Sequence, residues 1–175
     1  MRIMQSKNTK KHVKKHRVAS LTRIAESISP CTNGNTKIGW KRISLTVDSG
    51  ACENVIDAGE EIPNYPVKEG RASKLGVKYA SATGEEIPNM GEIMLPMYTH
   101  GGGKNKMCMQ VAEVSRPLAS VQRICEAGHT VVFDEEGSYM YNKTTHELNF
   151  FREEGGNYMF DVWIPPNDGQ DFGRQ

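Results

Sequence analysis

Residues 45–56 read LTVDSGACENVI, and this stretch organises the rest of the chain. Residues 43–47 alternate apolar and polar side chains, which predicts a half-buried β-strand. The strand runs directly into Asp-Ser-Gly at 48–50, a turn-forming triplet, and the apolar pair at 55–56 follows. The pattern predicts a carboxylate at the end of a strand, with apolar chain on both sides. Such surroundings shift the pKa of a carboxyl group and suit it to acid–base chemistry.

The charge of the 175-residue chain is unevenly distributed, although its formal net charge is only +1. Residues 1–23 carry eight Lys or Arg and no acidic residue, which leaves 14 basic and 21 acidic residues, a formal charge of −7, for the remainder. This basic arm favours two readings, weak contact with nucleic-acid phosphates or a solvated tail. The length and the apolar content of 37% indicate one domain with some unpacked chain.

The four cysteines are scattered and form no C-x-x-C pair, which predicts neither a zinc site nor a dense disulfide scaffold. The N-terminus is charged where a signal peptide needs an apolar core, and no apolar run reaches transmembrane length. We therefore expect reduced thiols, no membrane insertion and an intracellular location, in the cytoplasm or nucleus. No motif predicts a bound metal or cofactor.

Turn residues and hydrophobic periodicity divide the chain into four segments. We expect a basic, largely disordered arm at 1–36, a β domain at 37–129, a small β extension at 130–164 and a disordered tail at 165–175. The expected elements are a surface loop over 57–75, a hairpin of strands at 76–81 and 92–97 with its tip near 83–84, a strand at 106–114, a short helix at 121–128, and strands at 130–133, 138–141, 147–151 and 158–164.

In this order of elements the chain resembles the retropepsin-type aspartic proteases. The family signature is a run of apolar residues, then Asp-Ser/Thr-Gly-Ala/Ser, then an apolar pair, and residues 45–56 match it without a gap. The resemblance implies a mainly β fold, a closed acid-protease half-barrel with one short C-terminal helix, in which the hairpin at about 79–95 is a flap over the substrate. The family's apolar-apolar-Gly element aligns with residues 118–120, where Ser120 replaces the glycine.

The C-terminal part resembles one branch of the family more specifically. Residues 114–134 are similar to the junction that follows the protease in copia-type retrotransposon polyproteins, where a leucine-rich segment leads into a small β region before the integrase. Residues 154–161 resemble the end of that pre-integrase segment, and the integrase's His/Cys zinc region is absent. The resemblance covers about residues 43–164 and implies a fragment or a domesticated relic of such a polyprotein.

Aspartic proteolysis needs two carboxylates that share one proton, because like charges so close together cannot both ionise. The chain contains a single Asp-Ser-Gly, so we expect a homodimer in which the Asp48 side chains of two copies meet at the two-fold axis. The resemblance implies that Ser49 binds across this axis and that Gly50 lets the backbone approach the carboxylate pair. It further implies contacts between an extended peptide and four residues, Ala51, Ala82, Thr83 and Gly84.

Two other readings stay open at this point. The triplet at 48–50 could be a plain turn in an unrelated β-rich domain. The chain could also be a catalytically inactive relic of a retropepsin. Such a relic would bind peptide through the groove, or nucleic acid through residues 1–23.

Overall fold

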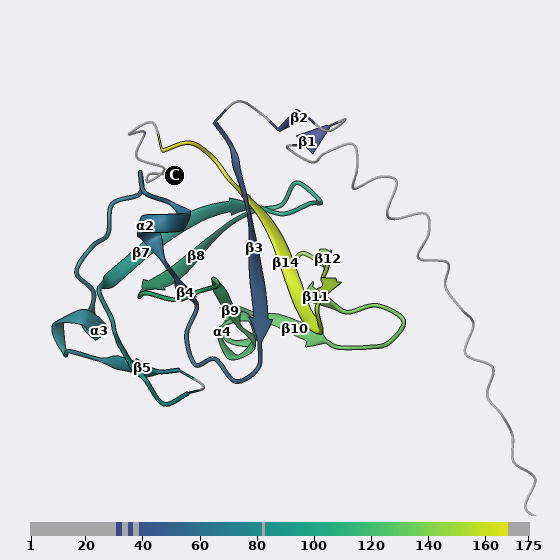
Figure 1. Ribbon diagram of the computed structural model, residues 1–175. Helices are drawn as coiled ribbons and strands as arrows, with labels where there is room; N and C mark the ends of the chain where they lie inside the picture. The colour runs from purple at the N-terminus through teal and green to yellow at the C-terminus, as the bar shows by residue number, and fades with distance from the viewer. Residues whose placement is uncertain (1–30, 33–34, 37–38, 82, 168–175) are drawn as a thin grey trace, which may run out of the picture.

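The computed structural model describes residues 31–32, 35–36, 39–81 and 83–167 (Figure 1). The chain is mainly β, with 45% strand and 11% helix, which confirms the predicted fold class at this level. The arm at 1–23 and Ala82 of the expected hairpin tip lie outside the described residues. Among the described residues, no helix has the length and apolar character needed to span a membrane.

A mixed seven-stranded sheet forms the body, in the order β13-β14-β3-β9-β4-β8-β7. A further pairing of β14 with β7, at Trp163 and Tyr98, closes six of these strands into a ring. The pairs β3–β9 and β4–β8 are parallel, and the other pairs are antiparallel. The strands are β3 (Lys41–Asp48), β4 (Val55–Ile56), β7 (Gly91–Tyr98), β8 (Lys104–Val111), β9 (Leu118–Ser120), β13 (Arg152–Glu154) and β14 (Asn157–Ile164).

The alternation in residues 43–47 produces β3, as predicted. Ile43, Leu45 and Val47 face the core and are buried, with exposed fractions of 2%, 0% and 7%. Full burial of such a side chain stabilises the fold by about 1.5–3 kcal/mol. The core inside the ring therefore holds β3 in register up to its last residue, Asp48.

Strand β9 lies between the two strands that flank the Asp48 loop. It runs parallel to β3, with Asp48 opposite Ser120, and antiparallel to β4, with Val55 opposite Leu118. A parallel neighbour requires a long crossover connection, and the chain from β4 to β8 supplies it. The segment 118–120 is thereby brought next to both ends of the loop.

The hairpin differs from the prediction in its second strand. Strand β5 (Lys78–Ala80) pairs with β6 (Glu86–Pro88), and the strand expected at 92–97 instead belongs to β7, which pairs with β8. The break lies at Gly91, whose φ is +143° and where a Cβ atom would lie 2.6 Å from the Lys68 carbonyl oxygen. Only glycine fits this close approach, so the hairpin ends before β7 begins.

The segment 57–75, predicted as a loop, contains two helices of four residues each, α2 (Ala58–Glu61) and α3 (Arg71–Lys74). Asp57 caps α2, since its Oδ1 accepts the backbone N–H groups of Gly59 at 3.0 Å and Glu60 at 3.2 Å. A single helical turn has no apolar periodicity, which explains why the pattern missed both helices.

The predicted short helix and the strands after it are present, with small shifts at their ends. Helix α4 (Val121–Glu126) leads into a three-stranded sheet of β10 (His129–Val132), β11 (Tyr139–Asn142) and β12 (Leu148–Phe150). A short pair, β1 (Cys31–Thr32) and β2 (Asn35–Thr36), lies within the segment expected to be a largely disordered arm. Pro165 is buried and its carbonyl accepts the Tyr65 hydroxyl at 2.8 Å, so the expected tail begins with ordered residues.

Residues 130–164 do not form a body of their own. Met140 and Phe151 belong to the same hydrophobic cluster as Leu45 of β3. Strand β14 pairs with β3 over six residues, and Figure 1 shows the two strands side by side across the molecule. The separate sheet of β10, β11 and β12 begins close to the predicted division after residue 129, but it shares its hydrophobic core with the rest of the chain.

Candidate active site

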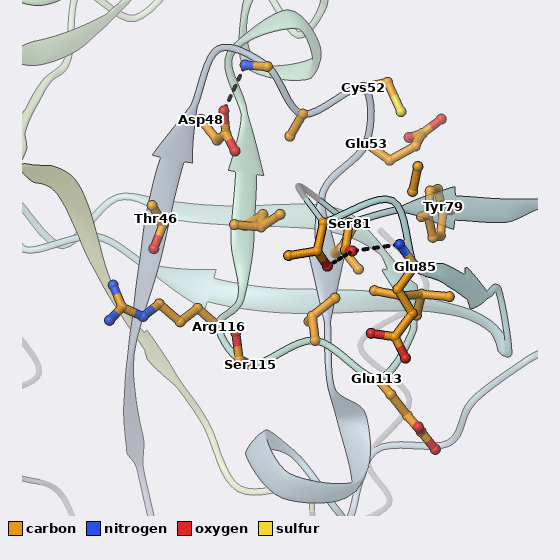
Figure 2. Close-up of a pocket in the computed structure, with 18 of the residues that line it drawn as sticks. Thr46, Asp48, Cys52, Glu53, Tyr79, Ser81, Glu85, Glu113, Ser115 and Arg116 are labelled. Carbon is orange, nitrogen blue, oxygen red and sulfur yellow. Dashed lines mark hydrogen bonds between the residues drawn. The ribbon is translucent and has the colours of Figure 1, made fainter.

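A cavity of about 750 Å³ opens between the Asp48 loop and the β5–β6 hairpin (Figure 2). Residues from 46 to 55 form one wall, residues from 78 to 87 form the other, and the segment 113–118 closes one end together with Asn157. Of the predicted site residues, the cavity is lined by Asp48, Gly50, Ala51 and Thr83. Ser49 and Gly84 are exposed and do not line it.

Asp48 is the last residue of β3, and its side chain is half-buried at the edge of the cavity. Its Oδ1 accepts the backbone N–H of Gly50 at 2.7 Å, which holds the carboxylate against its own loop. A Cβ atom at position 50 would lie 3.3 Å from this same oxygen. Glycine at position 50 therefore leaves room for the carboxylate.

Two buried polar residues, Asn54 and Ser120, hold the Asp48 loop in place; we call this pair the clasp. Their exposed fractions are 7% and 0%. The Ser120 hydroxyl donates to the Ala51 carbonyl at 2.6 Å, and the Ser120 N–H donates to Asn54 Oδ1 at 2.9 Å. Asn54 Nδ2 donates in turn to the Cys108 carbonyl at 3.2 Å. The clasp thus joins the loop to β9 and β8.

Ser120 stands where the family resemblance places glycine, and its side chain has two functions that glycine cannot supply. Besides binding Ala51, its Oγ accepts the backbone N–H of Arg123 at 3.3 Å and caps α4. Serine is a favoured N-cap residue, because its oxygen satisfies an amide that has no partner within the helix. The serine therefore couples the start of α4 to the Asp48 loop.

The charge of Glu53 is balanced by Arg123 of helix α4. The Arg123 guanidinium donates to both Glu53 oxygens, through Nε at 2.9 Å and through Nη2. It also contacts Glu126 at 2.7 Å, and these hydrogen bonds, the one to Glu53 first, raise the pKa of Arg123. Arg123 lies 70 positions from Glu53 in the chain, so no local pattern identifies this partner.

The hairpin wall is anchored at its base by a second polar network around Asn89, which is 8% exposed. Asn89 Nδ2 donates to the Tyr79 hydroxyl and to Gln110 Oε1, both at 2.8 Å, and its Oδ1 accepts the Gly91 N–H at 2.9 Å. Burial raises the pKa of Tyr79, and the Asn89 bond opposes this shift. The base of the hairpin is therefore tied to β8 across the sheet.

Among the described residues, the hydrogen bonds at the tip of the hairpin are local. The Ser81 hydroxyl lies 2.8 Å from the Thr83 hydroxyl and accepts the Glu85 N–H at 3.0 Å. Ser81 and Glu85 are also joined through their backbones at 2.9 Å. In Figure 2 these bonds stay within the hairpin and none crosses to Asp48. The tip is thus positioned by its own turn.

Several cavity residues were missed by sequence reasoning, because no local motif identifies them. Tyr79 and Glu85 come from the hairpin, and Glu113 and Arg116 come from the segment before β9. Cys52 also lines the cavity and is a free, exposed thiol. Within the described part of the chain, no group of three or more His, Cys, Asp or Glu side chains could hold a metal ion.

Comparison of the chain with protein-family models, curated proteins and solved structures found no match. The assignment of the site therefore rests on its residues and their geometry.

Proposed function

We propose that this chain is an aspartic endopeptidase of the retropepsin type, with Asp48 of two copies as its catalytic pair. The observation that carries the proposal is the placement of Asp48. It ends a buried strand, its carboxylate is held by the Gly50 N–H at 2.7 Å, and it faces a cavity of about 750 Å³. This volume lies within the range of ligand-binding pockets, which is about 300–1,000 Å³.

The reaction follows from two carboxyl groups that share one proton. One Asp48 is ionised and accepts a proton from water, while the other is protonated and donates to the carbonyl oxygen of the peptide. The hydroxide equivalent bonds to the carbonyl carbon and forms a tetrahedral intermediate. Its collapse breaks the C–N bond, and the nitrogen leaves as an amine after it receives a proton from the pair.

The surroundings of Asp48 support this chemistry. Catalysis requires the reacting groups to be held within a fraction of an ångström of their productive positions, and the clasp fixes the loop from two strands. The hairpin is anchored at Asn89 and only locally bonded at its tip, as suits a flap that closes over bound peptide. The closed six-stranded ring and helix α4 after β9 support the finer assignment to the retropepsin fold.

The second copy is proposed to approach on the side of Ser49. This residue is exposed and does not line the cavity, so its hydroxyl is available to a partner loop. Strand β14 already pairs with β3 along Lys41 to Thr46, which occupies that edge within one chain. The two copies are therefore expected to meet through their Asp48 loops rather than by exchange of terminal strands.

The test is cleavage of a mixed peptide library between about pH 4 and 7, the range in which a shared-proton carboxyl pair is active. The Asp48→Asn variant should lose at least about 10²–10⁴-fold in rate, the usual contribution of a general acid–base group. A thermal melt of the variant should match the wild type, and sedimentation should show a dimer. Equal cleavage by both proteins would refute the assignment of Asp48.

A second candidate is an inactive retropepsin relic that binds peptide in the same cavity. The single Asp-Ser-Gly of the chain favours it, because a monomer then has only one carboxylate of the pair. A folded, dimeric protein that binds peptide but cleaves none would establish this alternative. Peptide binding would then be unaffected by Asp48→Asn.

A further inference from the structure

The charged side chains around the cavity are more acidic than basic. Four carboxylates and two cationic groups line it: Asp48, Glu53, Glu85, Glu113, Lys78 and Arg116. Whether these charges act on a ligand depends on the partners that each already has. Paired charges are largely cancelled at the distances from which a ligand would meet them.

Two of the six are neutralised by partners outside the cavity lining. Glu53 is bound by the Arg123 guanidinium through both oxygens. The Lys78 ammonium binds Glu86 at 2.6 Å across the two strands of the hairpin. The Lys78–Glu86 pair carries no net charge. Arg123 balances Glu53 but also binds Glu126, so that cluster as a whole keeps a formal charge of −1.

The remaining charges are three carboxylates and one guanidinium, a formal −2. Within the described residues, Glu85 and Glu113 take part in no ion pair. Arg116 forms no direct ion pair either, but its charge helps to lower the pKa of Glu154. The cavity therefore offers unpaired negative charge to whatever enters it.

The charges are also separated in space. In Figure 2, Glu85 and Glu113 lie toward one side of the cavity and Arg116 lies toward the opposite side. Glu85 belongs to the hairpin and Glu113 to the segment after β8, so the two carboxylates come from different walls. A cationic side chain at this side can be attracted by the hairpin and by the body of the protein together.

We infer that this site selects peptides with a Lys or Arg side chain directed toward Glu85 and Glu113; the inference rests on the function proposed above. The same arrangement disfavours Asp or Glu there, because a like charge would be placed beside two unpaired carboxylates. Arg116 repels a second cation at the other side and so orients the peptide within the cavity. Glu85 and Glu113 are thus specificity residues for the proposed protease.

The experiment compares matched peptides. Products of the mixed library are sequenced by mass spectrometry, and the best cleaved peptide is resynthesised with its Lys or Arg replaced by Gln. In the wild type the kcat/KM ratio of the cationic peptide to the Gln peptide should be about five to ten, as two partly exposed ion pairs would give. The double variant Glu85→Gln/Glu113→Gln should bring this ratio close to one.

Two further variants make the comparison specific. Arg116→Gln should raise the ratio, because it removes the only unpaired cation of the described lining. Glu135→Gln removes an exposed carboxylate in the turn between β10 and β11, outside the cavity, and should leave the ratio unchanged. The wild-type ratio should also fall as salt is raised toward about 1 M, where the Debye length is about 3 Å.

Binding to the Asp48→Asn protein separates this inference from the proposed function. It is followed by fluorescence anisotropy with a labelled library peptide that contains one Lys and with its Lys→Gln counterpart, both chosen without regard to cleavage. Cleavage by the wild type without preference for the cationic peptide would overturn the inference alone. Absence of cleavage, with cation-selective binding that the double variant loses, would overturn the protease assignment and keep the selectivity. Neither cleavage nor selective binding would overturn both.

Discussion

The two walls of the cavity are held in different ways. The Asp48 loop is fixed by the clasp, whose bonds join Ser120 to residues 66 and 69 positions earlier in the chain. The tip of the hairpin is fixed by bonds among residues 81–85. The bonds of the clasp can break only if β9 separates from the sheet. The bonds at the tip of the hairpin can open locally. The wall that carries the carboxylate is therefore coupled to global stability, and the wall that covers it is not.

The largest effect is expected when the clasp is broken. Asn54→Ala leaves the buried Ser120 N–H and the partly buried Cys108 carbonyl without their partner. Each unsatisfied group costs about 1–3 kcal/mol, so the free energy of unfolding should fall by about 2–4 kcal/mol in urea denaturation. Asn64→Ala, which removes the same side chain from an exposed position, is the matched control and should change stability by less than about 0.5 kcal/mol. Equal stability of wild type and Asn54→Ala would mean that the loop is not held by the clasp.

A smaller and more local effect is expected at the base of the hairpin. Asn89→Ala removes the bonds to Tyr79, Gln110 and Gly91, and should cost about 1–2 kcal/mol. Hydrogen exchange should accelerate at the hairpin amides while the Thr46 amide, bonded to the Pro117 carbonyl, stays protected.

A substitution at the tip of the β5–β6 hairpin provides the control for Asn89→Ala. Ser81→Ala alters an exposed turn and should change stability by less than about 0.5 kcal/mol. If Asn89→Ala also accelerated hydrogen exchange at the Thr46 amide, the two walls would unfold as one cooperative unit. The hairpin would then not open independently of the Asp48 loop.

The smallest effect on stability is expected at Asp161 of β14, which pairs with β3 on the side opposite to β9. Burial raises the pKa of Asp161, but hydrogen bonds from Arg152, at 3.2 Å, and from Ser44, at 2.5 Å, outweigh it and leave the pKa below its ordinary value. A depressed carboxyl pKa adds stability that is present above the unfolded-state pKa, about 3.9 for Asp, and is lost as pH falls through the folded-state value.

Asp161→Asn should therefore lower stability at pH 6 by up to about 1 kcal/mol, as expected for a partly exposed ion pair. The difference from the wild type should disappear at a pH well below about 3.9, where Asp161 is protonated in both states. Urea denaturation of both proteins at the two pH values measures this. A difference that persists in acid would show that packing, rather than charge, is responsible.

Local patterns in the sequence were sufficient for much of this fold. Alternation in residues 43–47 predicted β3, and alternation after residue 106 predicted β8. A largely apolar segment at 158–164 predicted β14. Gly128, interpreted as the residue that caps the C-terminus of the helix, predicted the end of α4 to within two residues. These strands and the helix end depend on residues only a few positions apart, so a local sequence pattern can predict them.

The hairpin and the clasp show where local patterns fail. Residues 86–97 contain two strands with different partners, and only the close approach of Gly91 to Lys68 separates them. Asn54 and Ser120 are polar residues that a pattern assigns to the surface, yet both are buried. Their burial depends on a crossover that brings residues 66 positions apart within hydrogen-bond distance.

The sequence by itself determined that a carboxylate would stand at the end of a buried strand, because alternation and an Asp-Ser-Gly turn are local properties of residues 43–50. The tertiary structure decided what surrounds that carboxylate. It placed β14 beside β3, brought β9 under the loop, and lined one cavity with Asp48, Glu85 and Glu113. These contacts join residues far apart in the chain, and burial of one shared core, rather than any local preference, selects them.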